Sequence, residues 1–192
     1  MKFKIARILS CVTFASSVSA TAAGLAAGSI GSETDGSITC PASLNGVVVF
    51  KPTVGLVSHR YVVPISHSQD AATADADTWR GDYSNGLLVD GLKGMRIGVM
   101  RAPNVDAALF DAAHATLKAG DAFSGPSANQ LPAVAGFPHL TVPMGLSAGL
   151  PVGLSFIGPK WHDHAVLKAG YAYEQLSKAR VTPQLRPTLG RK

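Results

Sequence analysis

Four short apolar segments, rich in β-branched residues, limit the fold of this chain more than any other feature. They lie at residues 46–53, 95–101, 139–144 and 152–157. Runs of this length and composition predict strands that are buried within one large sheet. Helical patterns occupy residues 21–30, 106–119 and 163–180. Strands interspersed with helices predict an α/β fold, in which a mixed β-sheet is covered by helices.

The first twenty residues have the pattern of an export signal. Residues 1–7 (MKFKIAR) are basic, residues 8–18 are moderately apolar, and residues 18–20 (VSA) resemble a small-residue cleavage site. This pattern predicts a signal peptide over residues 1–20 and a periplasmic or secreted protein. An ordinary first helix in a cytoplasmic protein is the alternative.

The distribution of charge argues against nucleic acid as a partner. The formal net charge is +5, but stretches with basic and no acidic residues lie at the two ends, in residues 1–20 and 178–192. A nucleic-acid-binding protein carries its positive charge on a folded face. We therefore expect no nucleic-acid partner, and we interpret residues 181–192 as a basic C-terminal tail.

No segment predicts a cofactor, a metal site or a membrane span. The chain has two cysteines, Cys11 and Cys40, and no CxxC pair. Residues 162–164 (HDH) place their two histidines on different sides of a helix, which predicts a solvated helix start. No apolar run reaches the roughly 18 residues that a spanning helix needs.

The most suggestive stretch for chemistry is a loop at residues 31–37 (GSETDGS). A serine that follows glycine at the end of such a loop can expose its Oγ together with several backbone N–H groups. Those N–H groups can stabilise the oxyanion that forms during acyl transfer. Ser37 is therefore the candidate nucleophile.

The longer sequence around this loop resembles the core of the amidase signature family. The similar segments are residues 31–38 (GSETDGSI), 41–48 (PASLNGVV), 51–58 (KPTVGLVS), 64–70 (PISHSQD) and 133–158 (AVAGFPHLTVPMGLSAGLPVGLSFIG). The TDGS form of the loop is closest to the bacterial peptide-amidase-like branch. In all, the resemblance covers residues 22–70 and 92–180.

The resemblance implies an incomplete amidase-signature fold and a hydrolase of carboxamides, either peptide C-terminal amides or small amides. In that family a Ser–cis-Ser–Lys triad performs the hydrolysis, and no cofactor is implied. The nucleophile falls on Ser37. The oxyanion hole falls on the backbone amides of Thr34, Asp35, Gly36 and Ser37 itself.

This sequence departs from the family pattern at the other two members of the triad. Counting back from Ser37 places the bridging serine at Thr13, and only Lys2 and Lys4 lie upstream of that point. A cis peptide before a non-proline residue costs about 3–4 kcal/mol, and the pattern gives no reason to expect a threonine to adopt it. We therefore expect a catalytically impaired Ser37. A non-catalytic remnant, or a secreted binding module that uses the loop at 31–37, is the alternative.

Two further side chains invite a catalytic interpretation. His67 and Asp70 could complete a hydrolase triad with Ser37, since such triads occur in any sequence order. His67 lies in the family-like segment at 64–70, which does not supply the family's base, and it is interpreted as a loop residue. Lys51 ends a strand and is interpreted as a structural or solvated ammonium.

The family's extra length is missing before residue 22 and at two junctions where the sequence periodicity breaks down, near residues 71–93 and 120–128. The sequence therefore predicts one amidase-like domain over residues 21–180, truncated and internally deleted. The remaining strands would lack neighbours and expose unpaired backbone groups. We expect a marginally stable chain, or a partner chain that completes the sheet.

Overall fold

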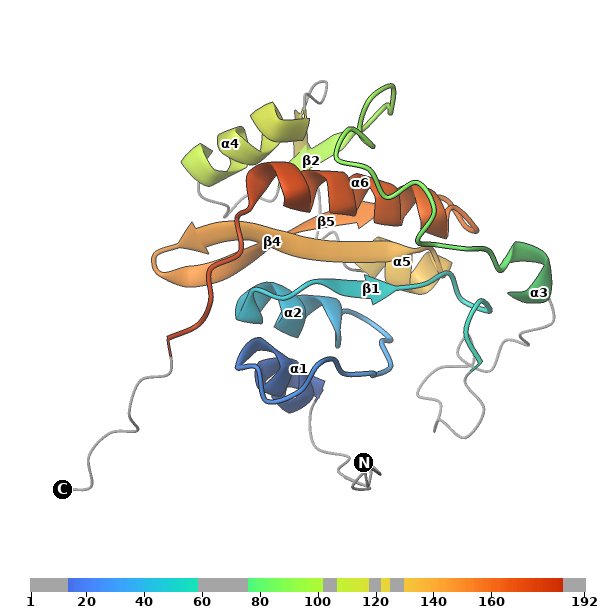
Figure 1. Cartoon of the computed structure of the whole chain (residues 1–192), viewed down its shortest axis with the longest axis horizontal. Helices are drawn as coiled ribbons and strands as arrows, with labels where there is room; N and C mark the ends of the chain where they lie inside the picture. The colour runs from blue at the N-terminus through green and yellow to red at the C-terminus, as the bar shows by residue number, and fades with distance from the viewer. Residues whose placement is uncertain (1–13, 59–75, 102–106, 118–121, 125–129, 185–192) are drawn as a thin grey trace.

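The structure is a computed structural model, and it describes residues 14–58, 76–101, 107–117, 122–124 and 130–184 (Figure 1). The helices are α1 (Phe14–Ala22), α2 (Thr39–Asn45), α3 (Ala76–Trp79), α4 (Ala107–Leu117), α5 (Gln130–Ala135) and α6 (Asp163–Ser177). The strands are β1 (Val49–Lys51), β2 (Val99–Arg101), β3 (Ala122–Ser124), β4 (His139–Ser147) and β5 (Leu150–Ile157).

The described strands form two separate sheets. An antiparallel sheet has the order β1-β4-β5, and a parallel pair joins β2 to β3. The prediction of an α/β fold is confirmed, but the prediction of one sheet containing all four strand segments is wrong for the described residues. The segment at 95–101 contributes β2, which pairs with β3 instead. Helix α4 lies between these two strands in sequence, as the crossover of a parallel pair requires.

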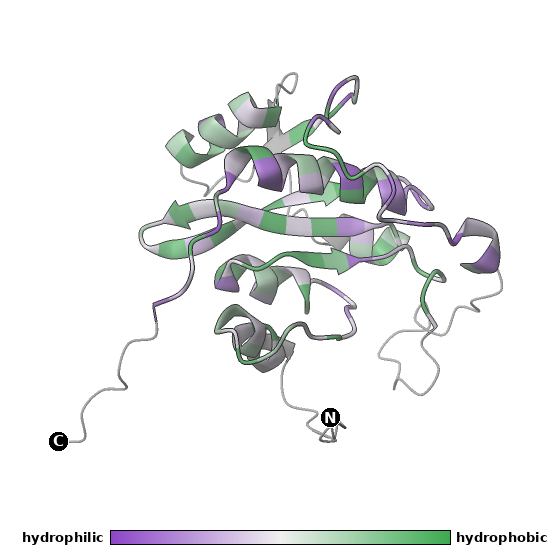
Figure 2. Ribbon diagram, in the orientation of Figure 1, coloured by the Kyte–Doolittle hydropathy of each residue, from purple (hydrophilic) through white to green (hydrophobic). Residues whose placement is uncertain are grey.

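The main hydrophobic core lies between the three-stranded sheet, α4 and α6. In Figure 1, α6 runs along β4, and in Figure 2 much of the ribbon of β4 and β5 has the colour of hydrophobic residues. Gly170 lets the helix approach the sheet closely, because a Cβ placed there would overlap the side chain of Leu140. The buried residues of this core are Ala113, Leu117, Leu140, Val142, Met144, Phe156, Val166, Ala169 and Tyr173.

A second, smaller core lies between α1 and α2. Val18 and Ala22 of α1 pack against Ala42 of α2 and against Val47, and all four side chains are buried. The prediction of a helix at 21–30 is wrong, since only its first two residues belong to α1. Helix α2 begins two residues after the loop predicted at 31–37, where no helix is predicted from the sequence. Cleavage after residue 20 would divide α1, and the signal peptide stays a prediction.

Replacing Val18 by aspartate is expected to lower the free energy of unfolding by about 2–4 kcal/mol, because the substitution buries a charge without a partner. Val18 is only 5% exposed. Ser17, one residue earlier on the same helix, is exposed, so Ser17→Asp is the matched control and should change the midpoint of thermal unfolding little. Equal midpoints for the two variants would show that α1 does not contribute to the folded core.

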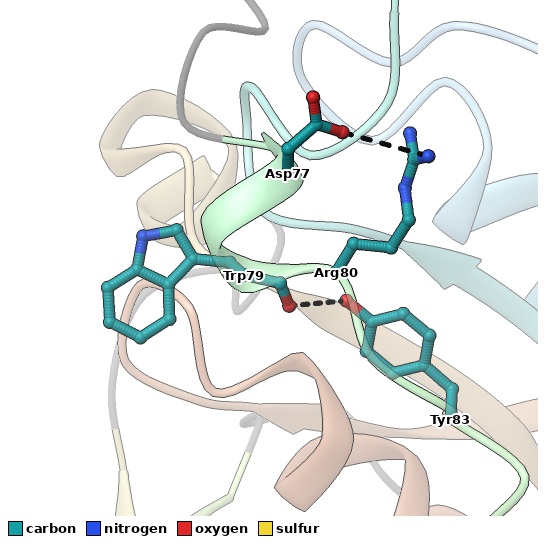
Figure 3. A network of polar contacts seen from close by, with 4 residues as sticks. All are labelled: Asp77, Trp79, Arg80 and Tyr83. Atoms are coloured by element: carbon teal, nitrogen blue, oxygen red, sulfur yellow. Dashed lines mark hydrogen bonds and ion pairs between the residues drawn. The ribbon is translucent and has the colours of Figure 1, made fainter.

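The described part of the first predicted junction, residues 76–93, is a segment that docks along α6. The side chains of Trp79 and Trp161 stack with their ring planes 6° apart, and His164 Nε2 donates to the Asn85 carbonyl oxygen at 2.5 Å. Figure 3 shows that the Tyr83 hydroxyl donates to the carbonyl of Trp79. Figure 3 also shows the ion pair between Asp77 of α3 and Arg80, the residue that follows this helix. Leu92 then packs against the main core.

Candidate functional site

A row of polar side chains lies on one face of the three-stranded sheet. Lys51 is opposite His139 across the β1–β4 pair, and Thr141 is opposite Ser155 across the β4–β5 pair. Side chains alternate between the two faces of a strand, so all four point away from Leu140 and α6. The Ser43 Oγ of α2 accepts a hydrogen bond from the Gly153 amide at 2.7 Å, which places α2 over this polar face.

The loop at residues 31–37 leads directly into α2. Gly36 has a φ of 92°, a left-handed conformation that a side chain disfavours, and it is buried, whereas Asp35 and Ser37 are exposed. Within the described part of the chain, Ser37 Oγ makes no hydrogen bond, and the backbone N–H groups of Asp35, Gly36 and Ser37 also lack acceptors. The loop therefore presents a hydroxyl and three successive amide donors.

The carboxylate of Glu33 accounts for the next two amides. Its Oε2 accepts hydrogen bonds from the backbone N–H of Ile38 at 2.8 Å and of Thr39 at 2.6 Å. A carboxylate at this position satisfies donors that helix geometry leaves unpaired at the start of α2. The same side chain therefore fixes where the loop ends and the helix begins.

Lys51 is a buried cation on the polar face. Its Nζ donates to the carbonyl oxygen of Phe137 at 2.6 Å, and only 8% of the residue is exposed. Burial lowers the pKa of the Lys51 ammonium, and the negative charges of Glu33 and Asp163 oppose that shift. The side chain is structural, as the sequence interpretation allowed.

His139 is a fully buried imidazole next to Lys51. Its Nε2 and Ser155 Oγ are 2.7 Å apart, and Ser155 Oγ lies 3.2 Å from Thr141 Oγ1. Burial lowers the pKa of His139 from 6.5 to about 4; the Glu33 carboxylate opposes this shift and the Lys51 ammonium adds to it. His139 is therefore neutral at physiological pH.

Asp163, the first residue of α6, faces inward. Its carboxylate accepts from the backbone N–H of Thr53 at 2.7 Å and from Thr53 Oγ1 at 2.5 Å. Thr53 Oγ1 in turn accepts from the backbone N–H of Trp161. The prediction of a solvated helix start at 162–164 is wrong for Asp163, which is 3% exposed. Among the described residues, no group of three His, Cys, Asp or Glu side chains is placed to hold a metal ion.

The structure places some of the sequence-predicted site residues together and says nothing of others. Thr34, Asp35, Gly36 and Ser37 form one continuous loop, whereas Thr13, His67 and Asp70 lie outside the described residues. Sequence reasoning missed the buried polar groups beside the loop and at the start of α6. The only signal for them was polarity inside apolar segments, as at His139 within residues 139–144.

The comparisons with known proteins point to amidases. Residues 16–78 match the family model described as Amidase. A probable amidase of Arabidopsis thaliana is 40% identical over 113 residues, which are 44% of this chain and 22% of that protein. A glutamyl-tRNA(Gln) amidotransferase subunit from Methanosarcina mazei is 34% identical over 131 residues, 51% of this chain and 27% of that protein.

Two solved structures have the same fold. The native peptide amidase from Stenotrophomonas maltophilia superposes with a TM-score of 0.76 at 24% identity, over 88% of this chain and 66% of that one. An amidase family protein from Bacillus anthracis gives a TM-score of 0.78 at 21% identity, over 88% of this chain and 61% of that one. The predicted amidase-signature fold is thereby confirmed. The chain spans only about a quarter of the length of the curated relatives, 22% and 27% for the two named above.

None of the helices that the structure describes is long and apolar enough to cross a bilayer.

Proposed function

We propose that this chain, which carries a partial amidase-signature fold, holds the acyl-binding part of a carboxamide hydrolase site and is catalytically impaired. Ser37 is the nucleophile position. The oxyanion-binding groups are the backbone amides of the loop from Thr34 to Ser37. The substrate class is a peptide C-terminal amide or another small amide. One observation carries the proposal: the loop presents three successive amide donors beside a serine hydroxyl, without acceptors in the described chain.

The electrostatics of the loop suit a carbonyl oxygen that gains negative charge during addition. Backbone amides that point at one site without internal partners stabilise an oxyanion and need no reorganisation when it forms. Glu33, which could otherwise compete as an anion, already accepts from Ile38 and Thr39. Asp35 is exposed, so its carboxylate can remain hydrated beside a bound neutral amide.

The impairment follows from the hydrogen bonding of two side chains, Ser37 and the buried Lys51. An alcohol is a weak nucleophile at neutral pH unless a base accepts its proton. Ser37 Oγ is hydrogen-bonded to no described residue, and Lys51 Nζ donates to Phe137 O instead. Thr13 stands where the resemblance places the bridging serine.

We expect the purified 192-residue chain to release no more ammonia from a peptide C-terminal amide than its Ser37→Ala variant does. The reason is that no described residue is hydrogen-bonded to Ser37 Oγ as a general base, a contribution that is commonly worth about 10²–10⁴-fold in rate. The measurement is coupled ammonia detection with both proteins at equal concentration. If the wild type released ammonia clearly faster than Ser37→Ala, the chain would be an active amidase and the proposed impairment would be wrong.

A binding module is the second candidate function, and the open amides of Asp35, Gly36 and Ser37 favour it. Backbone N–H groups in such a loop can hold a carboxylate or an amide oxygen without any covalent step. Binding of acetyl-phenylalaninamide that survives Ser37→Ala would support this function. Loss of binding in that variant would favour a site that depends on the hydroxyl.

A further inference from the structure

Glu33 differs from the other polar groups of the loop because its carboxylate bonds to the two amides that directly follow Ser37. The two distances, 2.8 Å to Ile38 N and 2.6 Å to Thr39 N, are those of charge-assisted hydrogen bonds. The amides of Asp35, Gly36 and Ser37 have no acceptor in the described chain. The carboxylate therefore marks the boundary between amides that bond to a side chain of the loop and amides that have no acceptor in the described chain.

Lys51 on β1 carries a positive charge that interacts electrostatically with this carboxylate. Its ammonium is buried on β1 and interacts electrostatically with both Glu33 and Asp163. A buried carboxylate without an opposite charge nearby is costly. His139, which lies beside Lys51 and also interacts with Glu33, is neutral at physiological pH and supplies no charge there. Lys51 thus joins the loop at 31–37 to the sheet and to the start of α6.

We propose that Glu33 is a positioning residue: it binds the amides of Ile38 and Thr39 and so leaves those of residues 35–37 free to bind an acyl oxygen. This inference rests on the proposed function of the loop. It goes beyond that function by assigning to the Glu33 side chain the selection of which backbone amides stay without an internal acceptor. If the carboxylate is removed, the amides of 38 and 39 lose their acceptor and the loop loses its fixed end.

The chain offers a matched control in Asp163. Asp163 is buried whereas Glu33 is half-buried, but it too interacts with Lys51 and binds two donors, both of them on Thr53. It does not bond to the loop in the described structure. Glu33→Gln and Asp163→Asn therefore remove equivalent charges, and only the first should affect the loop.

The experiment is residue-resolved amide hydrogen exchange, followed by ¹H–¹⁵N titration with acetyl-phenylalaninamide. Glu33→Gln should raise the exchange rates of Ile38 and Thr39 by about tenfold or more, since a charge-assisted bond is replaced by a weaker neutral one, and weaken binding of the probe. Asp163→Asn should raise the exchange rate of Thr53 and leave Ile38, Thr39 and the probe affinity unchanged.

The outcomes separate this inference from the proposed function. Unchanged exchange at Ile38 and Thr39 in Glu33→Gln, or equal effects of the two variants on the loop, would overturn the positioning role. In the wild-type chain, which needs no variant to fold, exchange at 38 and 39 as fast as at 35–37 would also overturn it. Failure of the wild type to bind the probe would instead count against the proposed function, while the exchange result would still decide the role of Glu33.

Discussion

Replacing Tyr173 by alanine should lower the free energy of unfolding by about 3–5 kcal/mol, the usual cost of truncating a large buried aromatic side chain. Tyr173 is 1% exposed on α6, and its ring lies against that of Phe156 on β5 with the ring centroids 5.9 Å apart. The substitution leaves a cavity at the centre of the main core. Because natural domains are stable by only about 5–15 kcal/mol, this substitution should remove a large share of the chain's stability.

Chemical denaturation followed by circular dichroism measures this effect. Tyr171, two residues earlier on the same helix, is only partly buried, so Tyr171→Ala is the matched control and should cost much less. Equal losses in the two variants would mean that α6 does not pack on the sheet through the face that carries Tyr173.

Acidification from about pH 7 to about pH 4 should destabilise the chain by about 3 kcal/mol through His139 alone, since each pKa unit corresponds to about 1.4 kcal/mol. Burial holds the pKa of this imidazole at about 4 in the folded chain, against 6.5 for an exposed histidine. Between pH 6.5 and about pH 4, the imidazole of His139 is protonated in the unfolded chain but not in the folded chain. Stability therefore falls as the pH falls through this window, and the loss is complete below about pH 4.

The comparison of wild type with His139→Gln isolates this contribution, because the carboxylates that titrate in the same range are common to both. Urea unfolding at several pH values should give a steeper loss for the wild type than for the variant between about pH 6.5 and pH 4. Parallel curves would show that His139 becomes protonated without unfolding, and hence that it is not buried as described.

Most of the secondary structure followed from hydrophobic pattern. The segments at 139–144 and 152–157 contain most of β4 and β5, and the helix predicted at 163–180 contains α6. These elements are long and strongly apolar on the face that packs, so local sequence determines them. The loop that carries Ser37 also followed from its glycine and serine content, which favours an irregular backbone.

The pairing of the strands and the support beneath the loop did not follow from the sequence. Which strands share a sheet depends on contacts between residues far apart in the chain, such as Lys51 with His139. The helix at Thr39–Asn45 begins in a run of glycine, serine and threonine, which does not favour a helix. The Glu33 carboxylate that ends the loop bonds to the amide of Ile38, five residues further along the chain. Such bonds arise from tertiary placement, which local propensity does not report.

The stability of the isolated chain, and a partner chain that completes the sheet, remain predictions. The smaller core between α1 and α2 buries four apolar side chains, and the segment at 76–93 stacks Trp79 on Trp161. Even so, β1 and β5 are the outer strands of the three-stranded sheet within the described chain. Unpaired strand edges are the usual place for a second chain to add.

The central claim is that the Ser37 loop binds an amide carbonyl through its open backbone amides but does not turn the amide over. A ¹H–¹⁵N titration of the labelled chain with acetyl-phenylalaninamide tests it directly, because the same spectra report the loop resonances and the integrity of the ligand. The account predicts that the amide resonances of Asp35, Gly36 and Ser37 shift most and that the ligand stays intact. Unshifted loop resonances, or conversion of the ligand to its acid by the wild type and not by Ser37→Ala, would contradict it.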